Sequence, residues 1–164
     1  ANNGHATPWH QDGQYWPIRP LATCTVWLAI DDAKVENGCL RFIKGSHKEK
    51  KLKSHNINDN KNLTLNQELD ESEYNEKDAV NLILKRGQIS LHDVYLVHGS
   101  EANNSSMARR AITMRFMPTS SVFDHQMVKD KNLFSKLNAS KYQDRKIYHM
   151  RGIDISGKNK LTYI

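Results

Sequence analysis

Short apolar and β-branched runs, separated by turn residues, constrain the fold of this chain more than any other feature. Six runs are predicted as strands, at residues 21–30, 39–43, 79–84, 88–92, 95–100 and 110–117. Turn residues such as Glu36-Asn37-Gly38 and Arg86-Gly87 separate neighbouring runs. Short strands with turns about every ten residues are typical of an all-β sandwich or barrel.

The first run, residues 21–30, is predicted as a strand buried on both faces, because it is almost continuously apolar. Trp27 shares one face of this strand with Thr25, where it either walls a pocket or packs in the core. Cys24 and Cys39 both lie in apolar runs and are expected to be buried, reduced thiols.

Length and composition suit a single domain over residues 1–164, because 38% of the 164 residues are hydrophobic. No run approaches the length of a membrane span and the first residues lack a signal-peptide pattern, so we expect no membrane association and a cytoplasmic location. The net charge of +6 accompanies no nucleic-acid-binding motif, so no nucleic-acid partner is expected. A small-molecule substrate that is anionic stays open.

Two segments depart from the strand pattern. Residues 48–79 are polar and weakly periodic, which indicates an insertion that is either a lid or a variable surface loop, with a short helix near residues 66–74. Residues 124–164 form a predicted C-terminal tail, with an amphipathic helix expected within residues 123–137 and an extended arm from Lys141. Because the chain starts with Ala1, close to the candidate site described next, we expect a fragment that lacks N-terminal elements.

His10 and Asp12 are the first candidate ligands of a metal ion. Residues two apart in a strand point to the same face, so the imidazole and the carboxylate would converge. A chain with 8 His and 18 acidic residues contains about one such pair by chance, and His47-Lys48-Glu49 is a second one. The second pair opens a charge run typical of a solvated loop, whereas aromatic residues surround the first, which we therefore favour. An iron that activates dioxygen typically takes two histidines and one carboxylate, and His98 is the candidate for the third ligand.

Three motifs together resemble the phytanoyl-CoA dioxygenase family of iron(II)- and 2-oxoglutarate-dependent oxygenases. They are Trp9-His10-Gln11-Asp12, Val35-Glu36-Asn37-Gly38-Cys39-Leu40 with Gly45-Ser46-His47, and Val97-His98-Gly99-Ser100 followed by Arg109. The resemblance covers Thr7 to about Phe123. It implies a double-stranded β-helix, a cupin-like jelly roll, whose open end holds Fe(II) through His10, Asp12 and His98.

The resemblance also implies a set of cosubstrate contacts. Arg109 matches the arginine that pairs with the distal carboxylate of 2-oxoglutarate, and Ser100, Trp27 and Gln11 match positions that contact the cosubstrate. A planar, always-charged guanidinium in an enclosed barrel suits a bidentate grip on a carboxylate.

Neighbouring residues leave alternatives open. Arg110 points the opposite way from Arg109 in a strand, so an error of one residue in register would exchange the two arginines. Arg115 shares the face of Arg109 and either binds an anionic substrate group or forms a structural ion pair. His92 either supports the site through hydrogen bonds or is a partly exposed residue at the end of a strand.

The function implied by the resemblance is hydroxylation of a C–H bond in a small organic substrate, with release of succinate and carbon dioxide. His10, Asp12 and His98 would be the catalytic residues. Related halogenases lack the carboxylate ligand, so Asp12 favours hydroxylation. Two other functions stay open: a non-catalytic metal-binding β-barrel module, and a zinc hydrolase with the same ligands. Neither of them needs Arg109 as a cosubstrate clamp.

Overall fold

The computed structural model describes residues 4–127, 142 and 144–164, and the chain divides into two compact units. The first unit comprises residues 1–14 and 24–115, and the second comprises residues 15–23 and 116–164. Every predicted site residue belongs to the first unit. A single domain over residues 1–164 stays a prediction.

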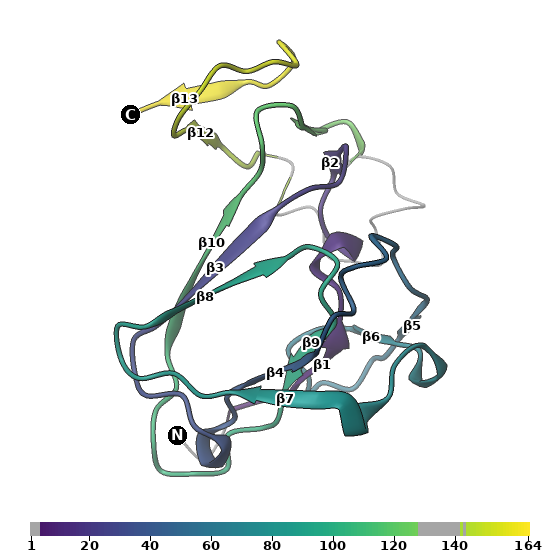
Figure 1. Cartoon of the computed structure of the whole chain (residues 1–164), viewed down its shortest axis with the longest axis vertical. Coiled ribbons are helices and arrows are strands. Elements are labelled where there is room, and N and C mark those ends of the chain that lie inside the picture. The colour runs from purple at the N-terminus through teal and green to yellow at the C-terminus, as the bar shows by residue number, and fades with distance from the viewer. Residues whose placement is uncertain (1–3, 128–141, 143) are drawn as a thin grey trace. The chain divides into compact units, whose positions relative to one another are not determined.

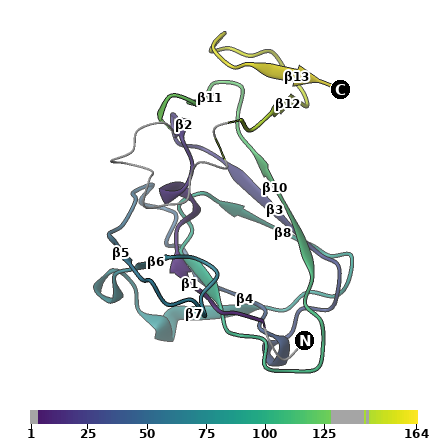
Figure 2. The same cartoon turned by 180° about the vertical axis from the view of Figure 1, so that it is seen from behind.

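Two larger β-sheets form the core of the first unit, as Figures 1 and 2 show from opposite sides. The four-stranded sheet has the order β1 (Thr7–His10), β9 (His98–Ser100), β4 (Leu40–Ile43) and β7 (Ala79–Leu82). The three-stranded sheet has the order β10 (Ala111–Phe116), β3 (Cys24–Ala29) and β8 (Ile89–Asp93). Strands far apart in sequence are thus neighbours in each sheet, which confirms the predicted double-stranded β-helix.

Strand β3 confirms the first predicted strand but not its burial on both faces. Thr25, Trp27 and Ala29 are buried, whereas the alternate residues are half-buried or, at Cys24, exposed. Only one face of the three-stranded sheet therefore turns into the core. The expectation of a buried thiol is correct for Cys39 and wrong for Cys24, and both cysteines are free.

Two clusters of buried side chains support the sheets. The first consists of Trp27, Ala29, Ala33, Cys39 and Leu40. The second consists of Ile43, Leu69 and Val97.

Gly99 allows β1 and β9 to come close together beside the candidate site. In this antiparallel pair His10 lies opposite His98, and Thr7 lies opposite Ser100. A Cβ atom on Gly99 would lie 2.9 Å from the carbonyl oxygen of Thr7, closer than real Cβ contacts come. A glycine between His98 and Ser100 is therefore required for this strand pairing.

The predicted insertion, residues 48–79, is a structured hairpin rather than an irregular loop. It contains β5 (His55–Ile57) and β6 (Gln67–Leu69), which pair antiparallel. The short helix predicted near residues 66–74 is limited to one 3₁₀ turn at Glu71–Glu73, because Gln67–Leu69 form β6. Leu69 is 1% exposed and packs with Ile43 and Val97, so the hairpin is part of the core.

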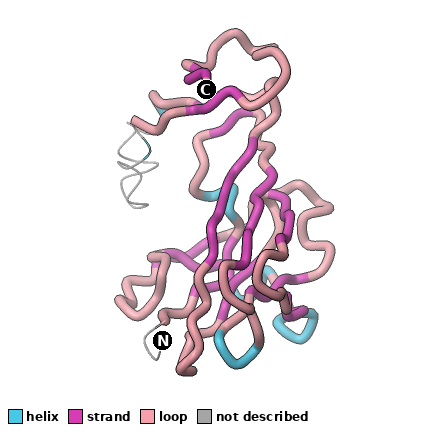
Figure 3. The backbone as a smooth tube through the Cα atoms, turned by 90° about the vertical axis from the view of Figure 1, so that its left-hand side faces the viewer, coloured by secondary structure: helices cyan, strands magenta, loops and turns pink. Residues whose placement is uncertain are grey.

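Helical structure in the described residues is limited to short 3₁₀ turns, which are cyan in Figure 3. They include η1 (Asp12–Gln14), η2 (Val35–Asn37), η3 (Glu71–Glu73) and η4 (Glu76–Asp78). None of the helical turns in the described ranges approaches the length and apolarity needed to cross a membrane.

The second unit contains two small sheets. In one, β2 (Ile18–Arg19) pairs antiparallel with β11 (Val122–Phe123). In the other, β12 (Ile147–His149) pairs parallel with β13 (Leu161–Tyr163), so the predicted arm from Lys141 contains paired strands. Most of the helix predicted within residues 123–137 lies outside the described residues, and residues 124–126 are not helical.

Candidate metal centre

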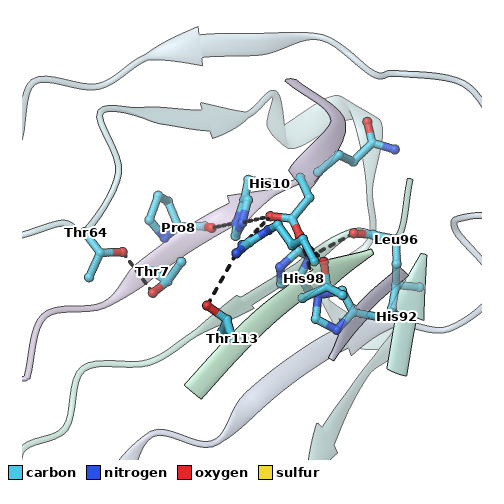
Figure 4. Close-up of polar contacts among 12 residues, drawn as sticks. Thr7, Pro8, His10, Thr64, His92, Leu96, His98 and Thr113 are labelled. Atoms are coloured by element: carbon cyan, nitrogen blue, oxygen red, sulfur yellow. Dashed lines mark hydrogen bonds and ion pairs between the residues drawn. The ribbon is translucent and has the colours of Figure 1, made fainter. Parts of the chain in front are cut away.

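The three predicted ligands, His10, Asp12 and His98, lie together in the first unit. Their side chains are buried, and each offers one ligand atom within 4.8 Å of the other two. Figure 4 shows the imidazoles of His10 and His98 side by side, and their ring centroids are 4.2 Å apart. Within residues 4–127, 142 and 144–164, this is the one group of three or more potential ligands that meets so closely.

Asp12 reaches the site by a different route from the one its spacing predicts. His10 ends β1, but Asp12 is the first residue of η1, so the prediction that both stand on one strand is wrong. The turn of the backbone after Gln11 brings the carboxylate to the imidazole, with Asp12 Oδ1 3.8 Å from His10 Nε2. Convergence of the ligands thus depends on this turn and not on strand alternation.

Hydrogen bonds to the backbone orient both histidines. Nδ1 of His10 is 2.9 Å from the carbonyl oxygen of Pro8, and Nδ1 of His98 is 2.9 Å from that of Leu96 (Figure 4). A carbonyl oxygen only accepts hydrogen bonds, so Nδ1 carries the proton in each ring. With the proton on Nδ1, Nε2 is the nitrogen through which a neutral ring binds a metal.

Burial and charge set the protonation states of the cluster. Burial lowers the pKa of His98 to about 3, so its imidazole is neutral at physiological pH. Burial alone would raise the pKa of Asp12, but His10, His92, His98 and Arg115 together hold that pKa well below its ordinary value. The site thus combines neutral imidazole with an ionised carboxylate, the forms that ligate a metal.

The two oxygens of Asp12 have different neighbours. Thr25 Oγ1 donates a hydrogen bond to Oδ2 over 2.9 Å, and His92 Nε2 lies 3.7 Å from the same oxygen. Arg115 Nη2 lies 3.4 Å from Oδ1. Of the two roles left open for Arg115, the structure shows the ion pair. His92 is 5% exposed, so it is an interior residue beside the site.

The predicted cosubstrate residues Trp27, Ser100 and Arg109 lie around Cys39 and Leu40. Trp27 packs in one apolar cluster with Cys39 and Leu40. Ser100 is directly opposite Leu40 in the pairing of β9 with β4. Arg109 is close enough to the Cys39 thiol to lower its pKa, although burial raises that pKa overall.

Two of these residues carry buried polar atoms without a hydrogen-bond partner among the described residues, Ser100 Oγ and Arg109 Nε. Burial lowers the pKa of Arg109, but a guanidinium stays protonated at neutral pH. An unpaired buried polar group costs about 1–3 kcal/mol and is rare in native proteins unless a ligand satisfies it. A carboxylate ligand would satisfy both donors.

Arg110 takes the opposite direction from Arg109. Its guanidinium donates two hydrogen bonds of 2.8 Å to Asp31 on the exposed side, and its backbone N–H donates a third of 2.9 Å. Of the two adjacent arginines, Arg109 is therefore the one with a buried and unpaired donor. This arrangement agrees with the register assumed from the sequence.

Gln11, the fourth predicted cosubstrate residue, is fully buried and bonded to the insertion. Its Nε2 donates to the carbonyl oxygens of Lys51 and Tyr95, and its Oε1 accepts from the backbone N–H of Lys53. Its backbone N–H donates to Nε2 of His55. Gln11 thus fastens the insertion to the segment between two metal ligands, and its contact with a cosubstrate stays a prediction.

Sequence reasoning overlooked Thr25 as a functional residue. The available signal was a polar residue on the same strand face as Trp27, in a run that is otherwise almost apolar. The rival metal pair is not supported, because His47 and the exposed Glu49 join no ligand group in the described part of the chain.

The fold and the cluster define a cupin-like β-helix protein with a candidate centre of two histidines and one carboxylate for a non-haem metal. The chain belongs to the phytanoyl-CoA dioxygenase family, because the sequence profile of that family matches residues 1–111.

Two curated relatives illustrate the extent of the match. A phytanoyl-CoA dioxygenase domain-containing protein 1 homolog of Dictyostelium discoideum is 36% identical over 110 residues, which cover 66% of this chain and 39% of that protein. The peroxisomal phytanoyl-CoA dioxygenase of Homo sapiens is 34% identical over 116 residues, covering 66% of this chain and 32% of that protein. The chain therefore spans about two fifths or less of the length of these relatives.

Solved structures share the fold. EvdO2 from Micromonospora carbonacea var. aurantiaca, in complex with 2-oxoglutarate, matches with a TM-score of 0.60 and 30% identity over 71% of this chain and 46% of that one. The non-heme monooxygenase ThoJ matches with a TM-score of 0.58 and 25% identity over 73% of this chain and 43% of that one. These similarities agree with the jelly roll and with a non-haem metal site.

Proposed function

We propose that this chain carries the metal and cosubstrate site of an iron(II)- and 2-oxoglutarate-dependent oxygenase. The observation that carries the proposal is the buried cluster of His10, Asp12 and His98, in which a backbone carbonyl oxygen holds each imidazole through Nδ1. Two neutral imidazoles and one carboxylate are the typical ligands of iron(II) in non-haem oxygenases. With a cosubstrate and dioxygen, bound iron(II) supplies hydroxylation of a substrate C–H bond, while 2-oxoglutarate leaves as succinate and carbon dioxide.

The protein's own groups would bind the cosubstrate. Arg109 and Ser100 carry unpaired buried donors, and we assign them to the distal carboxylate of 2-oxoglutarate. Trp27 would form an apolar wall beside that carboxylate and exclude water, which strengthens the ion pair with Arg109. Gln11 would hold the turn between His10 and Asp12 through its bonds to the insertion.

Arg109 favours this function over the two alternatives. A non-catalytic metal-binding module and a zinc hydrolase would both leave the buried Nε of Arg109 without a ligand. The substrate is proposed only as a small organic molecule, and the cytoplasmic location stays a prediction.

Binding of the cosubstrate to the iron tests the proposal. Anaerobic addition of iron(II) and 2-oxoglutarate to the purified protein should produce the visible charge-transfer absorption of the chelate. The Asp12→Ala variant should lose this absorption, because one of three ligands is missing. Absence of the absorption from the wild-type protein would rule the oxygenase out.

A matched pair of arginine variants tests the clamp. Arg109→Leu should raise the 2-oxoglutarate concentration needed for half of the absorption by at least about 30-fold, the effect of removing one partner of a buried charge pair. Arg110→Leu should leave this concentration unchanged, because Arg110 contacts Asp31 on the exposed side. Equal effects of the two substitutions would remove Arg109 from the cosubstrate site.

A further inference from the structure

The two oxygens of Asp12 are not equivalent, and the difference comes from the three-stranded sheet. Oδ1 lies 3.8 Å from Nε2 of His10 and 3.4 Å from Nη2 of Arg115, which donates to it. Oδ2 accepts the hydroxyl proton of Thr25 over 2.9 Å. A partial rotation of the carboxylate about its Cβ–Cγ bond would move Oδ2 away from the Thr25 hydroxyl and break this hydrogen bond.

Thr25 is well placed to prevent this rotation. It is 1% exposed, and its hydrogen bond with Asp12 is buried. As a β-branched residue in a strand it has few side-chain rotamers, so the direction of its hydroxyl is fixed by the backbone of β3. Its hydrogen bond is also charge-assisted, because the pKa of Asp12 lies well below its ordinary value.

His92 stands on the same side of the carboxylate as Thr25. In the antiparallel pairing of β3 with β8, Thr25 lies directly opposite His92. The two side chains of this cross-strand pair therefore point from neighbouring strands toward one oxygen, with His92 Nε2 at 3.7 Å from Oδ2. The ring of His92 packs against both Phe42 and His98, at centroid distances of 5.7 and 4.7 Å.

We propose that Thr25 is a positioning residue of the metal centre, which binds Oδ2 of Asp12 and thereby presents Oδ1 alone to the metal. The carboxylate would then offer one oxygen, Oδ1, to a bound metal ion, while Thr25 would hold the other. His92 confines Oδ2 from the adjacent strand. The inference rests on the metal site of the proposed function, but it does not depend on 2-oxoglutarate or on turnover.

Cobalt(II) binding measures this role without catalysis. Titration of the metal-free protein with Co²⁺ gives the dissociation constant, and the visible absorption of the bound ion reports its coordination. Thr25→Val, which replaces the hydroxyl by a methyl group of similar size, should weaken Co²⁺ binding by about 10–100-fold, as loss of a group that orients a ligand does. It should also change the absorption spectrum, and Thr25→Ser should restore both properties.

Thr23→Val provides the matched control. Thr23 is also buried, at 7% exposure, but its hydroxyl has no hydrogen-bond partner among the described residues. Its replacement should leave the Co²⁺ affinity and spectrum unchanged. Thermal unfolding of each metal-free variant shows whether the variant is folded. If Thr25→Val does not fold, the Co²⁺ affinities and spectra of Thr25→Ala and Thr25→Ser are compared instead.

The outcomes separate this inference from the proposed function. If the wild type binds Co²⁺ and folded Thr25→Val binds it with the same affinity and spectrum, Thr25 has only a packing role and the inference is wrong. If affinity falls but Thr25→Ser does not recover it, the hydroxyl is not the cause and the inference is also wrong. If the wild type binds no Co²⁺, the metal site itself is wrong, and the proposed function falls with it.

Discussion

The histidines and the aspartate of the metal centre are held in place by different parts of the chain. His10 and His98 each bond through Nδ1 to a carbonyl oxygen two residues earlier in their own segment. Asp12 instead contacts Thr25, 13 residues away, and Arg115, 103 residues away. The histidines carry their own orienting groups, whereas the aspartate obtains them from the three-stranded sheet.

This difference divides the work between the two sheets. The four-stranded sheet supplies both imidazoles, from β1 and β9. The three-stranded sheet supplies no ligand, but Thr25 on β3, His92 on β8 and Arg115 on β10 all reach toward the carboxylate. A change in the four-stranded sheet therefore removes a ligand, and a change in the three-stranded sheet misaligns one.

Loss of a histidine ligand should produce the largest effect. His98→Ala should reduce Co²⁺ affinity by more than about 100-fold, because a metal–ligand bond disappears. Loss of a group that only orients a ligand costs about 10–100-fold. Equilibrium titration of the metal-free protein measures this. His149→Ala is a suitable control, because its ring also bonds to a carbonyl, that of Gly152, but outside the cluster. Retention of wild-type affinity by His98→Ala would exclude His98 as a ligand.

The two histidines, which neighbouring backbone groups hold in place, are also the ligands whose local setting the sequence predicts. His10, His98 and Arg109 were identifiable from motifs, because each function is tied to a short stretch and to strands that appear as apolar runs. Strands β3, β4, β8 and β10 lie within their predicted ranges, or one residue from them, for the same reason.

For Asp12, the sequence predicted the ligand but not the contacts that hold it. The hydrogen bond of Thr25 with Asp12 depends on a tertiary contact between β3 and η1, and nothing in the local pattern around either residue specifies it. The outer face of β3 was misjudged because an apolar run does not reveal whether the second face of a sheet is covered. The position of Asp12 in a 3₁₀ turn was missed because a two-residue spacing fits both a strand and a tight turn.

Replacement of His92 should have a smaller effect than loss of a ligand. His92→Phe keeps an aromatic ring against Phe42 and His98 but removes the nitrogen beside Asp12. Because 3.7 Å exceeds hydrogen-bond length, we expect a change in Co²⁺ affinity of less than about 10-fold, below that for Thr25→Val. A loss as large as that of His98→Ala would instead identify His92 as a fourth ligand, and would contradict the division between the two sheets.

The smallest effect should come from a second remotely held carboxylate, Asp31, which lies at the surface. Arg110 bonds to Asp31 across 79 residues and is the main cause that holds the pKa of Asp31 below its ordinary value. A carboxylate with a lowered pKa in the folded state stabilises the fold above the pKa of the unfolded chain, about 3.9, and this stabilisation disappears as pH falls through the lower, folded value.

Arg110→Ala should therefore raise the pKa of Asp31 toward its ordinary value, which NMR titration of the side-chain carboxyl measures. Arg86→Ala, which removes a weaker electrostatic contribution, should raise it less. Neither substitution should alter Co²⁺ binding, because both arginines lie on the exposed side, and water screens a surface ion pair. If Arg110→Ala weakened Co²⁺ binding as much as Thr25→Val does, a surface ion pair would affect the metal centre as strongly as a buried contact with Asp12. That result would contradict the role given to burial beside the ligand.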